Sequence, residues 1–236
     1  MELYPASPAG FCFYEWYNRF TIVFSDRRQA GEMLADKLKK IGTPIAQVFA
    51  IPRGGAVVGE EIAKRLDIPL KLLLVKKIGA PKNSELAIGA VAPGGISYID
   101  RVLVGRLSIG QKELAKLTES KRRELAERKE KYKISYQKSL AGKTIIITDD
   151  GIATGATVKA AIKYLRLKKA KKIILGAPVV AKDTYDEIKS MVDELIVLEI
   201  PESFGAVGQF YRDFPQVNDE EVISILAFSN QRQASS

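Results

Sequence analysis

Two adjacent carboxylates, Asp149 and Asp150, directly follow the apolar segment 144–148 and open a loop rich in glycine and threonine. Gly151 and Gly155 allow backbone amides to turn toward a ligand, and the helix expected next would direct its positive end to the same point. The loop threonines add hydroxyl donors. Together these groups predict a site for one phosphate. Because an ionised carboxylate accepts hydrogen bonds from two hydroxyls, the acidic pair suits a sugar, and the loop predicts a ribose 5-phosphate site.

A tight turn with capping threonines and solvated aspartates would place the same residue types in a loop. The apolar strand before the acidic pair and the helix after the loop agree with each other, and this agreement favours the phosphate site. The loop is not a P-loop, because the sequence contains no Gly-x-x-x-x-Gly-Lys-Ser/Thr motif.

Short apolar strands and amphipathic helices alternate along the chain, and these elements must position the loop. Strands that are apolar throughout are typical of a parallel sheet covered on both faces. The alternation therefore predicts an α/β fold with a doubly wound, mainly parallel sheet. The expected strands are 45–51, 70–75, 144–148, 172–177 and 195–200, and the expected helices are 25–41, 55–66, 109–134, 156–167, 184–191 and 219–228.

Ligands of such sheets bind at the carboxyl ends of the strands, so the loops after these strands should carry the chemistry. Residues 77–100 are rich in glycine and proline and should be irregular, with a hairpin turning at Pro93-Gly94-Gly95. Residues 1–20 are rich in aromatic side chains and follow no clear pattern, so we expect them to form an N-terminal extension outside the main domain.

Composition removes several classes of chemistry. The sequence contains no histidine, which excludes His-based triads, His-ligated metal sites and the usual general base near neutral pH. The single cysteine, Cys12, cannot form an internal disulfide and fits a reducing cytoplasm. No stretch is long and apolar enough to cross a membrane, and the first residues do not resemble a secretory signal. The formal charge of +9 fits a nucleic-acid partner, a small polyanion or a solubilising surface.

The run from Asp149 to Thr157 resembles the signature with which type I phosphoribosyltransferases bind PRPP (5-phosphoribosyl 1-pyrophosphate): an apolar strand, two acids, then x-x-x-Thr-Gly-x-Thr. The likeness spans residues 21–228, which would form the transferase domain before a tail at 229–236, and is greatest to a group of uncharacterised predicted members. It implies that the two aspartates hold the ribose hydroxyls and contact Mg²⁺ through water or the ligand. The implied phosphate ligands are Gly151, Ala153, Thr154, Gly155, Ala156 and Thr157.

The resemblance assigns roles to two further loops. Pro52-Arg53-Gly54-Gly55 is similar to the family's pyrophosphate loop, in which the Arg53–Gly54 peptide would be cis; an ordinary Gly-Gly turn into a helix explains these residues equally well. Lys76 and Lys77, at the end of strand 70–75, could reach the pyrophosphate, although a solvated strand end competes with this interpretation for at least one of them.

Residues 78–98 correspond to the family's flexible lid, where Glu85 is a candidate proton acceptor; a static surface hairpin would fit the same sequence. From about residue 200, the chain resembles the hood of purine phosphoribosyltransferases. There Phe204 would stack on a base and Lys182 would meet an exocyclic oxygen, with core packing and a solvated lysine as the plain alternatives. Enzymes for 6-oxopurines usually have Asp where this chain has Ala153, so an ordinary hypoxanthine or guanine acceptor is not expected.

The resemblance implies an enzyme that transfers the phosphoribosyl group of PRPP to a nitrogenous base or related acceptor, releases pyrophosphate, uses Mg²⁺ and forms a homodimer. The candidate catalytic residues are Arg53, Lys76, Lys77 and Glu85. The alternative is a PRPP-sensing regulatory protein that binds nucleic acid, and the positive charge permits this function. DNA-binding members normally add a winged-helix domain, for which residues 1–20 are too short, whereas RNA could bind a basic face. A phosphatase-like or lyase-like use of the phosphate site is a third, weaker option.

Overall fold

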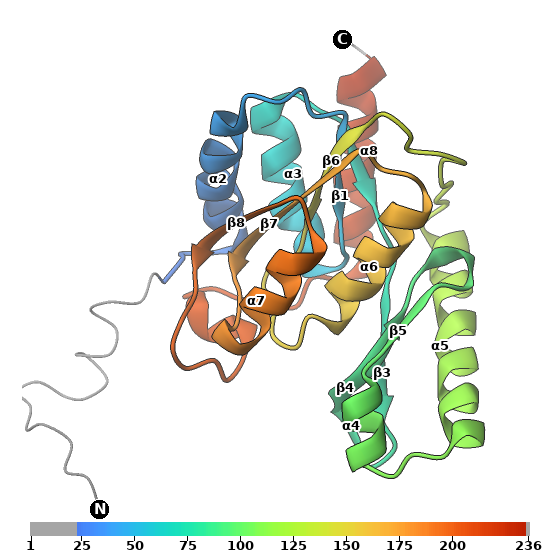
Figure 1. The fold of residues 1–236 in the computed structure, drawn as a ribbon. Coiled ribbons are helices and arrows are strands. Elements are labelled where there is room, and N and C mark those ends of the chain that lie inside the picture. Colours follow the sequence, from blue (N-terminus) through green and yellow to red (C-terminus); the bar gives the residue numbers. More distant parts are fainter. Residues whose placement is uncertain (1–22, 235–236) are drawn as a thin grey trace, which may run out of the picture.

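A five-stranded parallel sheet forms the centre of the computed structural model, which describes residues 23–234 (Figure 1). The strand order is β2-β1-β6-β7-β8. All residues of β1 and β6 are buried, which explains the apolar runs Val48–Ala50 and Ile145–Ile147 within them. The doubly wound, mainly parallel α/β fold is therefore confirmed. The strands are β1 (Gln47–Ala50), β2 (Leu70–Leu72), β6 (Thr144–Thr148), β7 (Lys172–Val179) and β8 (Glu194–Glu199).

Helices cover both faces of this sheet (Figure 1). Side chains alternate across each strand, so Val48 and Ile146 pack with α2, α3 and α8, whereas Ile145 and Ile147 pack with α6 and α7. The side chain of Asp26 caps α2 by accepting a hydrogen bond from the Gln29 amide at 2.8 Å. The helices are α2 (Arg27–Leu38, followed by the 3₁₀ turn Lys39–Ile41), α3 (Gly54–Leu66), α6 (Ala156–Leu167), α7 (Lys182–Met191) and α8 (Asp219–Ala234).

A second, antiparallel sheet forms the lid region and packs against α6. The turn at Pro93–Gly95 is confirmed, but the expectation of irregular structure was wrong, because three strands pair across the region. The expected strand 70–75 ends at Leu72. The expected helix 109–134 runs from Gln111 to Lys131, and a separate short helix at 101–106 precedes it. These elements are β3 (Lys76–Ala80), β4 (Asn83–Val91), β5 (Ser97–Ile99), α4 (Arg101–Arg106) and α5 (Gln111–Lys131).

The hood, residues 200–217, packs against the start of the described chain. It contains the 3₁₀ turn Val207–Phe210. The Phe24 amide donates to the Phe210 carbonyl at 2.8 Å, and the Phe24 and Tyr211 rings lie 5.3 Å apart in a buried aromatic cluster. Beyond the hood, α8 continues to Ala234, past the predicted end at residue 228. The predicted extension 1–20 lies outside the described residues.

The strand order reverses between β1 and β6, which are neighbours in the sheet although they are far apart in sequence. The Ile51 amide donates to the Thr148 carbonyl at 2.9 Å, so the loops after these two strands begin side by side. Such a reversal is where open α/β sheets bind ligands. Within residues 23–234, no helix is long and apolar enough to cross a membrane.

Candidate functional site

The loop after β6 has the shape that its sequence predicts. Gly155 has a left-handed φ of +68° immediately before α6, and an added Cβ would lie 2.9 Å from side-chain atoms of Thr184 and Ile188. The Thr184 hydroxyl donates to the Ala153 carbonyl and fixes the loop from below. Ala153 and Thr154 remain exposed. An exposed loop at a helix N-terminus can direct its amides to one phosphate.

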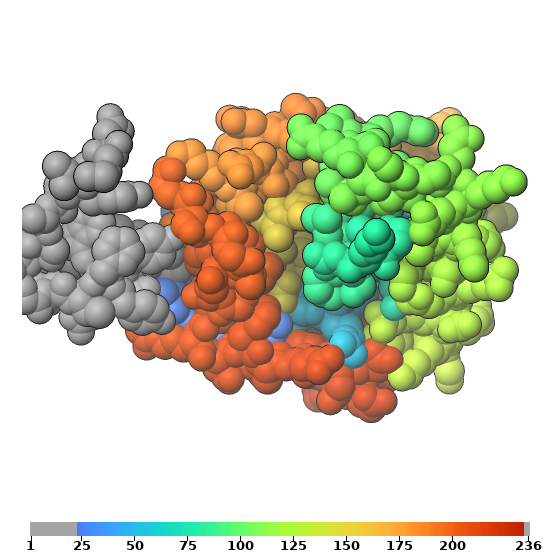
Figure 2. All heavy atoms as spheres, turned by 90° about the horizontal axis from the view of Figure 1, so that it is seen from below, coloured from blue at the N-terminus to red at the C-terminus, as the bar shows by residue number. Residues whose placement is uncertain are grey.

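This loop lies within a hollow that other parts of the chain border (Figure 2). Seen from below, the hood in orange-red stands on one side and the lid region in green on the other. The segments around residue 150, in yellow, and around residue 55, in cyan, lie between them. The structure therefore brings together the loops after β1 and β6, as the sequence predicts, and places the hood and lid region around them.

The acidic pair is held asymmetrically. Asp150 accepts a hydrogen bond from Arg27 Nε at 2.7 Å, and its carbonyl accepts one from the Tyr211 hydroxyl at 2.5 Å. Burial raises the pKa of Tyr211, so its hydroxyl remains a donor. Burial, and then the neighbouring Asp150 carboxylate, raise the pKa of Asp149 well above its ordinary value. Asp150 is thus fixed by a cation, while Asp149 is the member of the pair that takes up a proton more readily than an ordinary aspartate.

Arg27 connects the acidic pair to the hood. Its Nη1 donates to the Pro215 carbonyl at 2.8 Å, and its guanidinium lies 3.6 Å from the centre of the Phe214 ring. That ring stacks on Tyr211 with 4.9 Å between centroids. The Arg27 side chain is only 9% exposed. A buried arginine with three partners is well ordered, so Arg27 fixes the position of the Asp150 carboxylate.

The pyrophosphate-like loop after β1 lies directly against the acidic pair. A Cβ added to Gly54 would lie 1.8 Å from Asp150 Oδ2, and one added to Gly55 would lie 2.8 Å from the Asp149 Cα. Neither position has room for a side chain, so both glycines are required by close backbone approach. The cis peptide bond of this loop is Pro52–Arg53, one residue earlier than the Arg53–Gly54 bond that the resemblance implies, so that prediction was wrong.

Arg53 points from this loop toward the start of α8. Its Nη1 lies 3.7 Å from Asp219 Oδ1, and its side chain is partly exposed. Asp219 also accepts from Lys131 Nζ at 2.6 Å and from the Tyr132 hydroxyl at 2.7 Å. These donors lower the pKa of Asp219 to about 2. Arg53 and Arg27 both line a cavity of about 370 Å³ between the loop and the hood, which gives the site two cations for an anionic ligand.

The sequence predicted that Lys76 and Lys77 end a parallel strand, and this prediction was wrong. They begin β3, where Lys76 Nζ lies 3.2 Å from Glu124 Oε2 and Lys77 Nζ lies 3.0 Å from Glu85 Oε2. Glu85 is 88% exposed and stands near the β3–β4 turn. The structure thus pairs each lysine with a carboxylate on the lid side of the hollow.

The two residues predicted to contact an acceptor base, Phe204 and Lys182, contact other side chains of the protein. Phe204 packs against Phe210 with ring centroids 5.2 Å apart, and Lys182 Nζ lies 2.5 Å from Glu202 Oε1 on the exposed surface. Gly151 is enclosed by the hood, because an added Cβ would lie 2.4 Å from Val207 Cγ1. The phosphate loop and the hood are therefore in direct contact.

Comparisons with known proteins agree with this geometry. A family model of the phosphoribosyl transferase domain matches residues 27–215, which is most of the chain. The chain belongs to the phosphoribosyl transferase family. Two Mycobacterium tuberculosis relatives from different strains, provisionally named phosphoribosyl transferases, are each 36% identical over 205 residues. The match covers 86% of this chain and 46% of each relative, so the chain spans about half the length of these relatives.

A solved structure provides a further likeness. A protein from Thermus thermophilus is 35% identical, and the match covers 87% of this chain and 98% of that chain with a TM-score of 0.73. The likeness to that protein therefore includes the arrangement of the fold as well as the sequence.

The site contains a donor set that fits Mg²⁺. Two adjacent carboxylates lie beside the pyrophosphate-like loop, and Mg²⁺ in proteins is commonly bound by one or two carboxylates together with substrate phosphates. Between residues 23 and 234 there is no cluster of three or more His, Cys, Asp or Glu side chains that could hold a metal alone. Asp149 and Asp150 would therefore share the ion with the oxygen atoms of a ligand.

Sequence reasoning missed two residues of this candidate site. Arg27 is one of two consecutive arginines at the start of α2, and its burial distinguishes it from Arg28, whose side chain is 48% exposed. Tyr211 lies in the hood and was not among the candidate site residues. Both contacts to Asp150 span long separations along the chain, and no local pattern in the sequence reports them.

Proposed function

We propose that this chain transfers the phosphoribosyl group of PRPP to a nitrogen atom of a base or related acceptor and releases pyrophosphate. The observation that carries this proposal is the contact between the glycines of the β1 loop and the acidic pair after β6. It places a candidate pyrophosphate cradle, a candidate ribose site and a phosphate loop next to one another. A ligand with two phosphate-bearing ends on one ribose fits this arrangement.

The residues of the site would divide the ligand among them. The loop from Gly151 to Thr157 would hold the 5-phosphate through its amides and hydroxyls. Asp150, fixed by Arg27, would accept from ribose hydroxyls, with Asp149 beside it. Mg²⁺ bound between these carboxylates and the ligand would supply positive charge to the pyrophosphate oxygens.

The reaction would break the bond between ribose C1 and the pyrophosphate oxygen, and the bonding electrons would leave with pyrophosphate. Arg53 and the amides of Gly54 and Gly55 would stabilise the charge that develops on it. A nitrogen lone pair would form the new bond to C1, and the proton displaced from that nitrogen would pass to a base. Glu85 on the lid region, which pairs with Lys77, is the proposed proton acceptor, and Lys76 and Lys77 are the proposed lid cations for the pyrophosphate. Closure of the lid region would bring these groups to the ligand.

The acceptor would lie in the hollow beside the hood and the phosphate loop, where Phe204 and Lys182 are the proposed contacts. Because Ala153 stands where enzymes for 6-oxopurines usually have Asp, we expect a different acceptor class. We further expect a homodimer.

Calorimetric titration of PRPP with Mg²⁺ tests the proposal. Wild-type protein should bind, and an Asp149→Asn/Asp150→Asn variant should bind at least tenfold more weakly. An Asp183→Asn/Asp186→Asn variant is the matched control, since both aspartates are exposed on α7 and the charge change is equal. Equal binding by all three proteins, or no binding by folded wild type, would refute the ribose site. Loss in the acidic-pair variant alone would justify a screen of bases for pyrophosphate release.

A further inference from the structure

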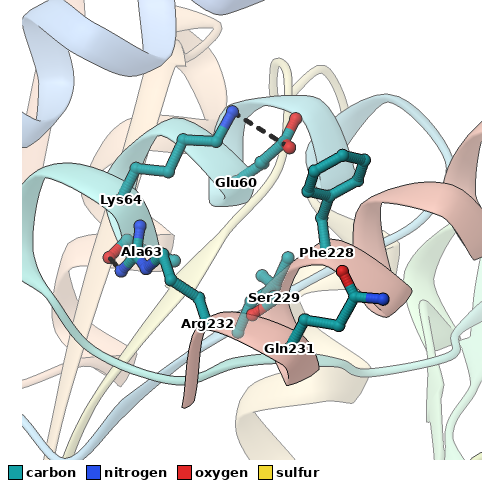
Figure 3. Close-up of a pocket in the computed structure, with 8 residues that line it drawn as sticks. Glu60, Ala63, Lys64, Phe228, Ser229, Gln231 and Arg232 are labelled. Atoms are coloured by element: carbon teal, nitrogen blue, oxygen red, sulfur yellow. Dashed lines mark hydrogen bonds and ion pairs between the residues drawn. The ribbon is translucent and has the colours of Figure 1, made fainter. Parts of the chain in front are cut away.

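Two cavities flank α8 on the side of the molecule away from the phosphate loop. One lies between α3 and α8, encloses about 250 Å³ and has the ion pair of Glu60 and Lys64 on its wall (Figure 3). Phe228, beside it, is 70% exposed. The other cavity is larger, about 440 Å³, and lies along the edge strand β2. Its volume falls in the range of about 300–1,000 Å³ that is usual for small-molecule sites.

Aromatic rings form much of the wall of the larger cavity. Tyr132, Tyr136, Tyr164 and Phe49 all line it. The Tyr132 hydroxyl is bonded to Asp219, and the Tyr136 hydroxyl accepts from the Leu74 amide at 3.1 Å. Because these two hydroxyls already have protein partners, an occupant would contact the rings through the small part of each that is open to the cavity. Planar ligands are favoured by such walls.

The opposite side of the cavity offers hydrogen-bonding groups. The hydrogen bonds from β2 to β1 use the Pro69 carbonyl and the Leu73 amide, so the alternate backbone groups of Leu70 and Leu72 face the open edge of the sheet. Gln137 also lines the cavity and donates to Gln47, whose buried Nε2 has no partner among the described residues. Gln137 and the edge of β2 therefore give this wall polar groups, which suit a heterocycle with a polar edge.

Charge narrows the class of ligand. The residues that line the cavity include two lysines, Lys71 and Lys133, and no carboxylate. A cationic ligand would find no negative partner there. A neutral ligand needs none, and an anionic ligand would meet the two lysines. The remaining wall comes from one face of α8, on which Ile223, Leu226 and Ala227 recur at helical spacing.

Tyr132 connects this cavity to the pyrophosphate-like loop. Its ring lines the cavity, its hydroxyl donates to Asp219 Oδ1 at 2.7 Å, and the same oxygen lies 3.7 Å from Arg53 Nη1. An occupant that shifts the Tyr132 ring must alter the hydrogen bond to Asp219. It would thereby alter Asp219, the carboxylate that pairs with Arg53 when no ligand is bound at the pyrophosphate-like loop.

We propose that the cavity along β2 is a second ligand site for a planar, neutral or anionic heterocycle of the nucleoside class. Its occupancy changes the environment of Arg53 through Tyr132 and Asp219. This inference does not require the proposed transferase activity, because both binding and the response of Arg53 can be measured without turnover.

Amide NMR titrations with adenosine, guanosine and cytidine test the binding step. At least one nucleoside should produce saturable shifts in segments 132–137 and 223–230. Ala227→Trp should abolish these shifts by filling the mouth from an exposed position on α8, and Ser224→Trp, exposed on the same helix but not lining the cavity, should preserve them. Shifts confined to the phosphate loop, or none with any of the three nucleosides at millimolar concentration, would overturn the proposal.

The same titration tests the connection to the pyrophosphate-like loop. In wild-type protein, the bound nucleoside should shift the amides of Arg53 and Gly54. Tyr132→Phe keeps the ring and removes the hydroxyl, so the variant should still bind the nucleoside but leave those two amides unchanged. Binding without any response at Arg53 in the wild type would refute the connection. A response that survives in Tyr132→Phe would refute the route through Asp219.

Discussion

Replacement of Arg27 by Met should destabilise the protein and release Asp150 from its fixed position. The substitution keeps an apolar stem over Phe214 but removes the guanidinium that contacts Asp150, the Pro215 carbonyl and the aromatic face. A hydrogen bond to a charged group contributes about 1.5–3 kcal/mol, and a cation–π contact contributes about 0.5–2 kcal/mol. Allowing for partial solvent access at Asp150, we expect a loss of about 3 kcal/mol in the free energy of unfolding.

A double-mutant cycle with Asp150→Asn isolates the ion pair from the other contacts of Arg27. Each single variant leaves one buried partner without its counter-charge, so the double variant should be more stable than the sum of the two losses implies. The expected interaction energy is about 2 kcal/mol. Urea denaturation followed by circular dichroism and by tyrosine fluorescence gives the four unfolding free energies, provided that the two probes have coincident transitions.

Arg28→Met is the matched control for this cycle. Arg28 is the next residue on α2, but its side chain is half-exposed and pairs with Glu60 and Glu61 on α3. Its substitution should cost about 1 kcal/mol and show no interaction with Asp150→Asn. If the Arg27 cycle gives an interaction energy below about 0.5 kcal/mol, which is the usual limit of additivity, Arg27 does not fix the position of Asp150.

Further predictions concern backbone approach, pH and a buried lysine. Gly54→Ala should weaken PRPP binding at least tenfold in calorimetry, because its Cβ would overlap the acidic pair, whereas Gly105→Ala, which meets open space in α4, should leave binding intact. Asp219→Asn should lower the urea midpoint at neutral pH. Since folding depresses the pKa of Asp219 to about 2, the difference from wild type should vanish as pH falls from about 4 to 2, and a constant difference would contradict this origin. The Lys159 ammonium is buried against Glu187 at 2.6 Å, so Glu187→Gln should destabilise the protein more than Lys159→Met in thermal melts, and the reverse order would refute the pairing.

The sheet and the phosphate loop could be predicted because their determinants are local. Ile145–Ile147 are apolar in succession, which only a strand buried on both faces requires, and Gly155 marks the left-handed turn into α6. The site depends on contacts that span the chain. The Arg27–Asp150 pair joins residues 123 positions apart, and nothing in the sequence distinguishes Arg27 from Arg28 before the fold buries one of them.

The lid region was harder to predict for a different reason. β3 and β4 pair with two register shifts near Ile78 and Gly79, so neither strand shows a clean alternation of apolar and polar residues. Lys76 and Lys77 follow an apolar run and therefore resembled the end of one long strand. The chain instead leaves the parallel sheet after Leu72 and enters the antiparallel one, a change of direction that periodicity does not reveal.

The contacts of the hood determine when the proposed ribose site could form during synthesis of the chain. A ribosome extends a chain from the N-terminus at about 5–20 residues per second, and the sheet through β7 could form while the hood is still within the exit tunnel. Asp150 would then lack Tyr211, and Arg27 would lack both Phe214 and the Pro215 carbonyl. A nascent chain that ends shortly before residue 211 would contain the complete signature loop without the groups that fix its second aspartate. The capacity to hold the ribose should therefore arise at a late and narrow range of chain lengths.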